Sequence, residues 1–273
     1  MPEGPEIRRA ADQVERVLKN EAIEAVAFGL PSLRPFERLL TGRIVTRVET
    51  RGKAMLTRFD NDLTLYSHNQ LYGRWYTTRR PQVPDTRRQL RVALHTATHS
   101  ALLYSASDIA VLTASQLAKH PFLARLGPDI LDPGLTKDIV AERLLLPQFR
   151  NRAIGGLYLD QGFLAGNGNY LRSDILWVSG VHPTRKPAEL DSKALTRLAR
   201  ETLGVSRRSY RTRGVTVPDR LARKLKANGA RFESYRFYAY GRESLPCRHC
   251  GASIERSEMS SRAVFFCPVC QPA

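Results

Sequence analysis

Four cysteines near the end of the chain form the most specific pattern of potential ligands. Cys247, Cys250, Cys267 and Cys270 have the spacing C-x2-C-x16-C-x2-C, which is typical of a structural zinc site built on a β-hairpin. Four thiolates complete a tetrahedral shell, so we expect one zinc ion per chain that stabilises a small module and does not catalyse. Two disulfides or free thiols are the alternative, and His249 lies between the ligands as a competing donor.

The segment between the two cysteine pairs, SEMSSRAVFF, carries a candidate phosphate ligand. It places Arg262 near the expected tip of the hairpin. A guanidinium there can bind a phosphate through two parallel hydrogen bonds. On spacing alone, a solvated charge in a turn remains the alternative.

A glycine-bearing stretch, LDQGFLAGNGNYLRSDILW at 159–177, is a second candidate phosphate site. Gly162, Gly166 and Gly168 interrupt two helical patterns, and Asn169 begins the second pattern. Tight turns before a helix expose backbone N–H groups at its positive end, where phosphate binds readily. An ordinary corner between two helices would show the same residues.

The chain opens with MPEGPEIRRA, which admits two interpretations. Pro5 suits a first helical turn, and the carboxylates of Glu3 and Glu6 are favoured at the positive end of a helix. Alternatively, Pro2 and its neighbours form a terminus that itself does chemistry. These residues alone leave both interpretations open.

Lys53 and the tripeptide Gln70-Leu71-Tyr72 have ordinary structural interpretations when taken alone. Lys53 follows Gly52 at the start of an expected strand, where a lone lysine is usually a surface charge. The tripeptide would be a strand end whose side chains alternate between the two faces of a sheet.

The overall composition indicates a folded protein with a polyanionic partner. The chain has 273 residues, 42% of them hydrophobic, and a formal net charge of +17 with a pI near 10.3. Nucleic acid is the first candidate partner and an anionic membrane surface the second. No apolar run approaches the ~20 residues that span a bilayer, and no signal peptide is evident. We therefore expect a cytoplasmic protein.

The elements that must position these residues fall into two parts. The apolar period at 5–18 predicts a helix, and 43–111 reads as short strands and turns. Within it, KAMLTRF and LTLYSH flank Asp60-Asn61-Asp62 as a hairpin, and RVALHT with ALLYSAS forms another strand pair.

After a linker punctuated by proline and glycine at 127–135, the pattern becomes helical. Helical periods occupy 136–146, 151–160, 168–178 and 190–203. The basic segment at 205–242 is weakly periodic, and we expect it to be partly mobile without DNA.

Several of these segments together resemble the formamidopyrimidine-DNA glycosylase/endonuclease VIII family, and most closely its bacterial endonuclease VIII branch. The segments that carry the resemblance are PEGPEIRRAAD, ETRGKA, LTLYSHNQLYG, LLYSASDI, GNGNYLR and SSR-x4-CPVC. The resemblance covers nearly the whole chain. It implies an α+β fold with four parts: an N-terminal catalytic β-sandwich with flanking helices (1–126), the linker (127–135), a helix–two-turns–helix DNA-binding domain (136–240) and a zinc-ribbon finger (241–273).

The resemblance also implies a catalytic set. Removal of Met1 would leave Pro2 as a free secondary amine that attacks C1′ of a damaged nucleotide, expels the base and forms a Schiff base. Glu3 matches the general acid/base of the family, and Glu6 matches an acid close to the site. Lys53 matches the lysine that contacts the phosphate beside the lesion and assists base loss.

The remaining matches concern binding to damaged double-stranded DNA. Asn169 and Arg262 match the pair that holds the phosphates flanking the flipped nucleotide. Gln70, Leu71 and Tyr72 match the wedge that fills the space left when the base leaves the stack. We expect a monomer that needs zinc and no organic cofactor.

Two positions depart from the family pattern. Asn167 replaces the apolar residue usual between the glycines, and Asp174 stands where the family usually has glutamate. The segment at 205–242, which helps contact the lesion in the family, matches poorly.

The leading hypothesis is therefore a base excision repair enzyme, a DNA glycosylase and AP lyase that removes oxidised pyrimidines and cleaves the strand by β,δ-elimination. One rival is the same chemistry on oxidised purines, against which the contiguous wedge argues. A rival of another class is a non-catalytic zinc-finger DNA-binding protein, which would need neither Pro2 nor Glu3.

Overall fold

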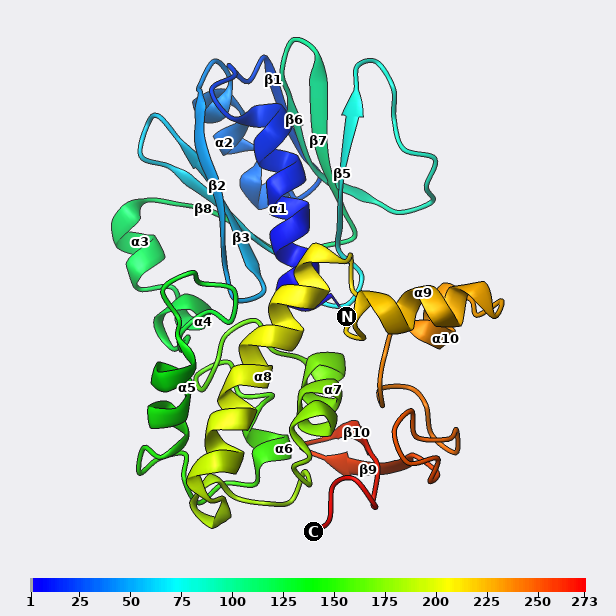
Figure 1. Ribbon diagram of the computed structural model, residues 1–273. Helices are drawn as coiled ribbons and strands as arrows, with labels where there is room; N and C mark the ends of the chain where they lie inside the picture. Colours follow the sequence, from blue (N-terminus) through cyan, green and yellow to red (C-terminus); the bar gives the residue numbers. More distant parts are fainter. Residues whose placement is uncertain (1) are drawn as a thin grey trace. The chain divides into compact units, whose positions relative to one another are not determined.

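The computed structural model describes residues 2–273, which form two compact units (Figure 1). The first comprises Pro2 and Glu6–Arg125, and the second comprises Glu3–Pro5 and Leu126–Ala273. Met1 lies outside the described residues.

The first unit is built on two four-stranded antiparallel sheets. The first sheet has the order β2 (Val45–Arg51), β3 (Ala54–Phe59), β4 (Thr64–His68) and β8 (Asp108–Leu112). The second has the order β1 (Ala25–Phe28), β6 (Leu90–His95), β7 (His99–Tyr104) and β5 (Arg74–Arg79). Both predicted strand pairs are confirmed, because β3 pairs with β4 and β6 pairs with β7.

The core of the first unit lies between the sheets and one long helix. Helix α1 (Gly4–Leu18) buries Ile7, Val14 and Leu18 at helical spacing, in one cluster with residues of both sheets such as Met55 and Leu103. This layering confirms the predicted β-sandwich. Four short helices complete the unit, namely η1 (Pro31–Leu33), α2 (Pro35–Leu40), α3 (Ala114–Ala118) and α4 (Pro121–Ala124).

The second unit is helical and ends in a β-hairpin. Its helices are α5 (Lys137–Leu144), α6 (Ile154–Leu157), α7 (Asn169–Ser179), η2 (Pro187–Glu189), α8 (Ser192–Arg211), α9 (Asp219–Ala227) and α10 (Phe232–Tyr235). Strands β9 (Glu255–Met259) and β10 (Arg262–Phe266) form the hairpin. Helix α7 packs against both α8 and β10, so one helix supports the helical core and the hairpin (Figure 1). Over residues 2–273, none of the helices combines the length and the apolar character that crossing a bilayer requires.

Some helical boundaries differ from the sequence prediction. The pattern at 151–160 yields only α6, because the chain turns at 159–163 with Asp160 Oδ1 accepting from Gly162 N at 2.8 Å. Helix α8 runs on to Arg211, past the predicted end at 203. The weakly periodic segment contains α9 and α10, whose apolar residues pack with Trp177 and Tyr238 in a small cluster of their own.

Residues 127–135 pack within the second unit. Ile130 and Leu135 are buried in its main core, and Ile130 N donates to Ala165 O at 3.0 Å. This segment therefore has buried contacts, although its prolines and glycines suggested a linker.

Candidate active site and metal centre

Glu3 is a buried carboxylate at the start of helix α7. Its Oε1 accepts from Tyr170 N at 2.8 Å and its Oε2 from Leu171 N at 3.3 Å, and the residue is 3% exposed. The residue that precedes the helix is Gly168, which offers no side-chain cap, so Glu3 satisfies these N–H groups from the other end of the sequence. The positive end of the helix dipole and two N–H donors therefore face the carboxyl group of Glu3.

The glycines of GNGNYLR permit this close approach. A Cβ on Gly168 would lie 2.3 Å from Cδ of Glu3, so no larger residue fits there. Gly166 has φ +95°, a conformation that glycine adopts without strain, and its carbonyl accepts from Gly4 N at 2.8 Å. The loop therefore binds the N-terminal residues of the chain.

Asn169 and Arg262 lie close together in the second unit, because Asn169 contacts the residue that follows Arg262. Asn169 is the first residue of α7, and its Nδ2 donates to the carbonyl of Ala263 at 2.8 Å. Arg262 is exposed at the start of β10, beside the turn of the hairpin. The sequence did not single out Arg172. This residue is fully buried, and its Nη2 donates to both Asn169 Oδ1 and Ala263 O. Its signal was a charged residue three positions after Asn169 within an apolar helical pattern.

Asp174 has a structural role in α7. Its carboxylate accepts from Tyr238 N and Ala239 N at 2.9 Å, from Tyr240 N at 3.0 Å and from the Thr216 hydroxyl. The shorter side chain thus has four donors despite being fully buried, and it fastens the segment that leads to the hairpin.

Asn167 is also fully buried, but its side chain is poorly satisfied. Its Oδ1 and Nδ2 have no hydrogen-bond partner among residues 2–273, whereas its carbonyl accepts from Gln161 Nε2 at 2.9 Å. An unsatisfied buried amide costs about 1–3 kcal/mol. A hydrogen bond therefore fixes the backbone at this position, whereas the buried polar side chain lowers the stability of the fold.

The first unit positions the predicted wedge. Gln70, Leu71 and Tyr72 lie in the turn between β4 and β5, where Leu71 is 50% and Tyr72 is 67% exposed. Gln70 N donates to Nδ1 of His68 at 3.1 Å, and Gln70 Oε1 accepts from the Ser107 hydroxyl at 2.8 Å. Two apolar side chains are thus presented to solvent on a turn that is anchored at its base.

Lys53 lies in the β2–β3 turn of the same unit. Burial lowers the pKa of His68; the Asp108 carboxylate opposes this effect and the positive charge of Lys53 adds to it. Lys53 and the wedge therefore share one neighbourhood through His68. Pro2 is half-buried, and Glu6 lies in the first turn of α1.

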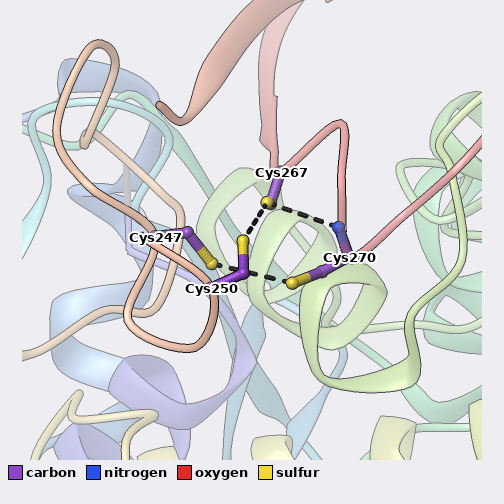
Figure 2. A group of neighbouring side chains, drawn as sticks. All are labelled: Cys247, Cys250, Cys267 and Cys270. Atoms are coloured by element: carbon purple, nitrogen blue, oxygen red, sulfur yellow. Dashed lines mark hydrogen bonds between the residues drawn. The ribbon is translucent and has the colours of Figure 1, made fainter. Parts of the chain in front are cut away.

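The four cysteines converge at the base of the hairpin. Figure 2 shows their side chains pointing toward one another, and their sulfur atoms all lie within 4.8 Å of one another. The Sγ atoms of Cys250 and Cys267 are 3.4 Å apart and those of Cys247 and Cys270 are 3.9 Å apart, too far for disulfides and close to the ~3.8 Å between thiolates around a tetrahedral zinc.

Backbone donors and thiol chemistry also fit a metal ion. Burial raises the pKa of Cys247, but N–H groups of Cys250 and His249 outweigh it, and the pKa falls to about 6. Burial and the neighbouring thiols raise the pKa of Cys267 and Cys270, so four thiolates need a cation among them.

Family models match three successive parts of the chain. The formamidopyrimidine-DNA glycosylase N-terminal domain matches residues 1–107, and the formamidopyrimidine-DNA glycosylase H2TH domain matches residues 126–225. A zinc finger found in FPG and IleRS matches residues 244–273, the segment that holds the four cysteines.

Individual relatives give the same result. Endonuclease 8 of Escherichia coli (strain K12) is 52% identical over 271 residues, which cover 99% of this chain and 100% of that protein. Among solved structures, Lactococcus lactis Fpg in complex with DNA containing N7-benzyl-Fapy-dG has a TM-score of 0.80 at 19% identity, covering 100% of both chains. The same enzyme with DNA containing an oxidised pyrimidine also has a TM-score of 0.80, at 19% identity and with 100% of both chains covered. At this identity, the structural likeness concerns the fold.

Proposed function

This chain belongs to the formamidopyrimidine-DNA glycosylase/endonuclease VIII family, and from that premise we propose that it removes oxidised pyrimidines from double-stranded DNA through a Schiff base at Pro2. Membership makes it a DNA glycosylase and AP lyase of DNA repair. The lesion class, the nucleophile and the roles of individual residues are the proposal.

The proposed nucleophile is the secondary amine of Pro2 after removal of Met1. An α-amine has a pKa near ~8, against about 10.4 for a lysine, so more of it is unprotonated at neutral pH. The nitrogen lone pair forms a bond to C1′, and the N-glycosidic electron pair leaves with the base. The bound nitrogen loses its proton, and the C1′–O4′ bond then breaks as O4′ takes up a proton, which leaves an iminium between Pro2 and C1′. The iminium makes the 2′-proton acidic, and loss of that proton expels the 3′ phosphate. Loss of the 4′-proton then expels the 5′ phosphate, and hydrolysis of the iminium frees the enzyme.

Glu3 is the proposed general acid/base, and its position is the observation on which the proposal chiefly rests. Its carboxylate directly follows Pro2 in the chain, and it is held by Tyr170 N and Leu171 N at the glycine-bearing loop. A carboxylate fixed in one orientation beside the nucleophile can take up the proton that the amine releases, deliver it to O4′ of the opening sugar, and exchange protons in the later steps. Glu6 is proposed to support this acid, since both lie at the start of α1.

The remaining residues are proposed to bind the DNA backbone and hold the damaged nucleotide outside the duplex. Lys53 contacts the phosphate beside the lesion and assists base loss, while Asn169 and Arg262 hold the flanking phosphates. Leu71 and Tyr72 are exposed on an anchored turn, which suits apolar groups that enter the base stack with Gln70. Extrusion costs a few kcal/mol and is least costly for a damaged base.

A structural zinc ion on the four cysteines is part of the proposal. It holds the β9–β10 hairpin, and with it Arg262, at the end of the second unit. One chain, acting as a monomer, would bind one lesion.

Borohydride trapping tests the proposal directly. Duplexes that carry thymine glycol, 8-oxoguanine or no damage are incubated with the enzyme and borohydride, and the cross-linked peptide is mapped. We expect a covalent complex at mature Pro2 on thymine glycol first, and its loss in Pro2→Gly. Pro5→Ala is the matched control, because Pro5 lies in the first turn of α1 but is not the nucleophile.

Each outcome has a definite meaning. Full trapping by Pro2→Gly would remove Pro2 from the mechanism. Stronger trapping on the 8-oxoguanine duplex than on the thymine glycol duplex would make oxidised purines, and not oxidised pyrimidines, the substrate class. Absence of any complex, with removal of Met1 verified by mass, would leave a DNA-binding protein without this chemistry.

A further inference from the structure

Arg172 carries a buried positive charge to which the proposed chemistry assigns no role. It lies on α7, and its side chain is among the largest that are fully buried. Burial lowers its pKa to about 10, although Glu3 and Tyr240 oppose this, so the guanidinium stays protonated at neutral pH. Burying such a charge is costly unless hydrogen bonds compensate it. Nη1 and Nη2 have acceptors, whereas Nε has no hydrogen-bond partner among residues 2–273.

The acceptors of Arg172 come mainly from the turn that carries Arg262. Two of its nitrogens share five oxygen acceptors, three of them carbonyls on the two sides of the β9–β10 turn. Nη1 donates to Gly155 O at 3.1 Å and Met259 O at 3.3 Å, and Nη2 donates to Asn169 Oδ1 at 2.6 Å, Ala263 O at 2.8 Å and Arg262 O at 3.2 Å.

The same contacts determine how the Asn169 amide is oriented. Because Nη2 of Arg172 must meet an acceptor, Oδ1 of Asn169 turns toward it and Nδ2 turns toward Ala263 O, 2.8 Å away. An amide NH2 group has two N–H donors, so one remains for a phosphate oxygen. Without Arg172, the amide could rotate and present its oxygen to the DNA, which would repel a phosphate.

We propose that Arg172 is a positioning residue that joins Asn169 and the Arg262-bearing turn into one rigid clamp for two DNA phosphates. The proposal rests on the proposed function, because the ligand of the clamp is the DNA backbone. A planar fork with several donors suits this task, whereas a lysine would supply the charge without the geometry.

Hydrogen exchange of the free protein tests the positioning without reference to activity. In Arg172→Met, we expect amides at 257–264 to exchange at least about tenfold faster, with the zinc content unchanged. Arg143→Met is the matched control, because Arg143 also binds two carbonyls of the second unit, those of Gly162 and Phe163, each at 2.6 Å. Equal protection of the hairpin in wild type and Arg172→Met, or equal loss in both variants, would overturn the proposal.

DNA binding then tests the consequence for the clamp. We expect Arg172→Met to weaken binding to lesion DNA about tenfold and to reduce the salt slope by about one, and we expect the same of Arg262→Ala. In an Asn169→Ala, Arg262→Ala background, Arg172→Met should add almost nothing; an additive loss would contradict the proposal. Arg172→Lys should show the same loss of DNA binding, because a lysine keeps the charge but not the planar guanidinium. If Arg172→Met does not fold, the lysine variant takes its place, and wild-type binding by that variant would show that the guanidinium geometry is not required.

Failure of the proposed function gives a different pattern. If wild type neither bound lesion DNA nor formed a trapped complex, the function would be wrong, while the hairpin exchange would still decide whether Arg172 holds the turn.

Discussion

We expect Glu3→Gln to slow base excision by about 100-fold or more, while DNA binding weakens by less than about tenfold. The carboxylate is isosteric with the amide, so the substitution keeps the size of the side chain and removes its charge and its proton chemistry. Loss of a general acid/base typically costs 10²–10⁴-fold, or roughly 3–5 kcal/mol of transition-state stabilisation.

The same change has a cost in stability that the structure allows us to estimate. Oε1 and Oε2 each accept a hydrogen bond from one backbone N–H of α7. A glutamine keeps one of these acceptors, and its NH2 group faces the second backbone N–H, where two donors repel each other. Loss of one charge-assisted bond costs about 1.5–3 kcal/mol, and loss of the charge at a buried helix N-terminus adds up to about 2 kcal/mol. We expect a total loss of about 1.5–5 kcal/mol, which a domain stable by about 10 kcal/mol survives.

Three measurements separate the two effects: the free energy of unfolding in urea, the single-turnover excision rate on thymine glycol, and the affinity for a duplex with an abasic analogue. Asp191→Asn is the matched control, because Asp191 caps α8 in the same unit and its Oδ1 accepts from Ala194 N at 2.7 Å. An asparagine caps a helix about as well as an aspartate, so this variant should lose only the charge effect, about 0.3–1 kcal/mol of stability, and no excision rate. Excision by folded Glu3→Gln at the wild-type rate would exclude Glu3 as the general acid/base, and equal losses of binding and excision would make it a structural cap alone.

Three further predictions concern the finger, His68 at the base of the wedge and Asn167 in the glycine-bearing loop. Chelation of zinc should abolish DNA binding while the N-terminal amine still reacts with formaldehyde and borohydride; binding that survives would exclude Arg262 as a phosphate ligand. Burial holds the pKa of His68 below its ordinary value, so below about pH 6.5 the folded state binds fewer protons than the unfolded chain, and the free energy of unfolding falls as the pH falls. In urea titrations at pH 7.5 and 5.5, His68→Asn should therefore lose less stability on acidification than wild type, and an equal loss would assign the pH dependence to other groups. Asn167→Val should raise the free energy of unfolding by about 1–2 kcal/mol, because it removes two unsatisfied buried atoms; a decrease would show that the amide is hydrogen-bonded to buried water.

Features that depend on neighbouring residues were predictable from the sequence. The cysteine spacing indicated the hairpin with Arg262 beside its turn, and the apolar period at 5–18 indicated α1 with its buried face. Both follow from local geometry, in which a turn or a helical repeat brings residues a few positions apart together. The family, and with it the glycosylase activity, followed from several such segments in combination and was confirmed by the comparisons.

Weak local patterns do not give the boundaries of helices where tertiary contacts decide them, and the expected partial mobility of 205–242 without DNA stays a prediction. The segment at 205–242 lacks a long period, yet α9 and α10 bury their few apolar residues against Trp177 and Tyr238, which stabilises short helices. Conversely, the helical pattern at 151–160 stops after Leu157, where the chain turns toward the glycine-bearing loop.

The sequence by itself determined which residue types are present for the chemistry, and the tertiary structure alone decided how they are held. Glu3 and Tyr170 are 167 positions apart, and Arg172 and Ala263 are 91 apart. No periodicity or motif spacing relates residues at such separations, because their contact depends on how whole elements pack. The carboxylate that caps α7 and the buried guanidinium that holds the hairpin turn are therefore properties of the fold.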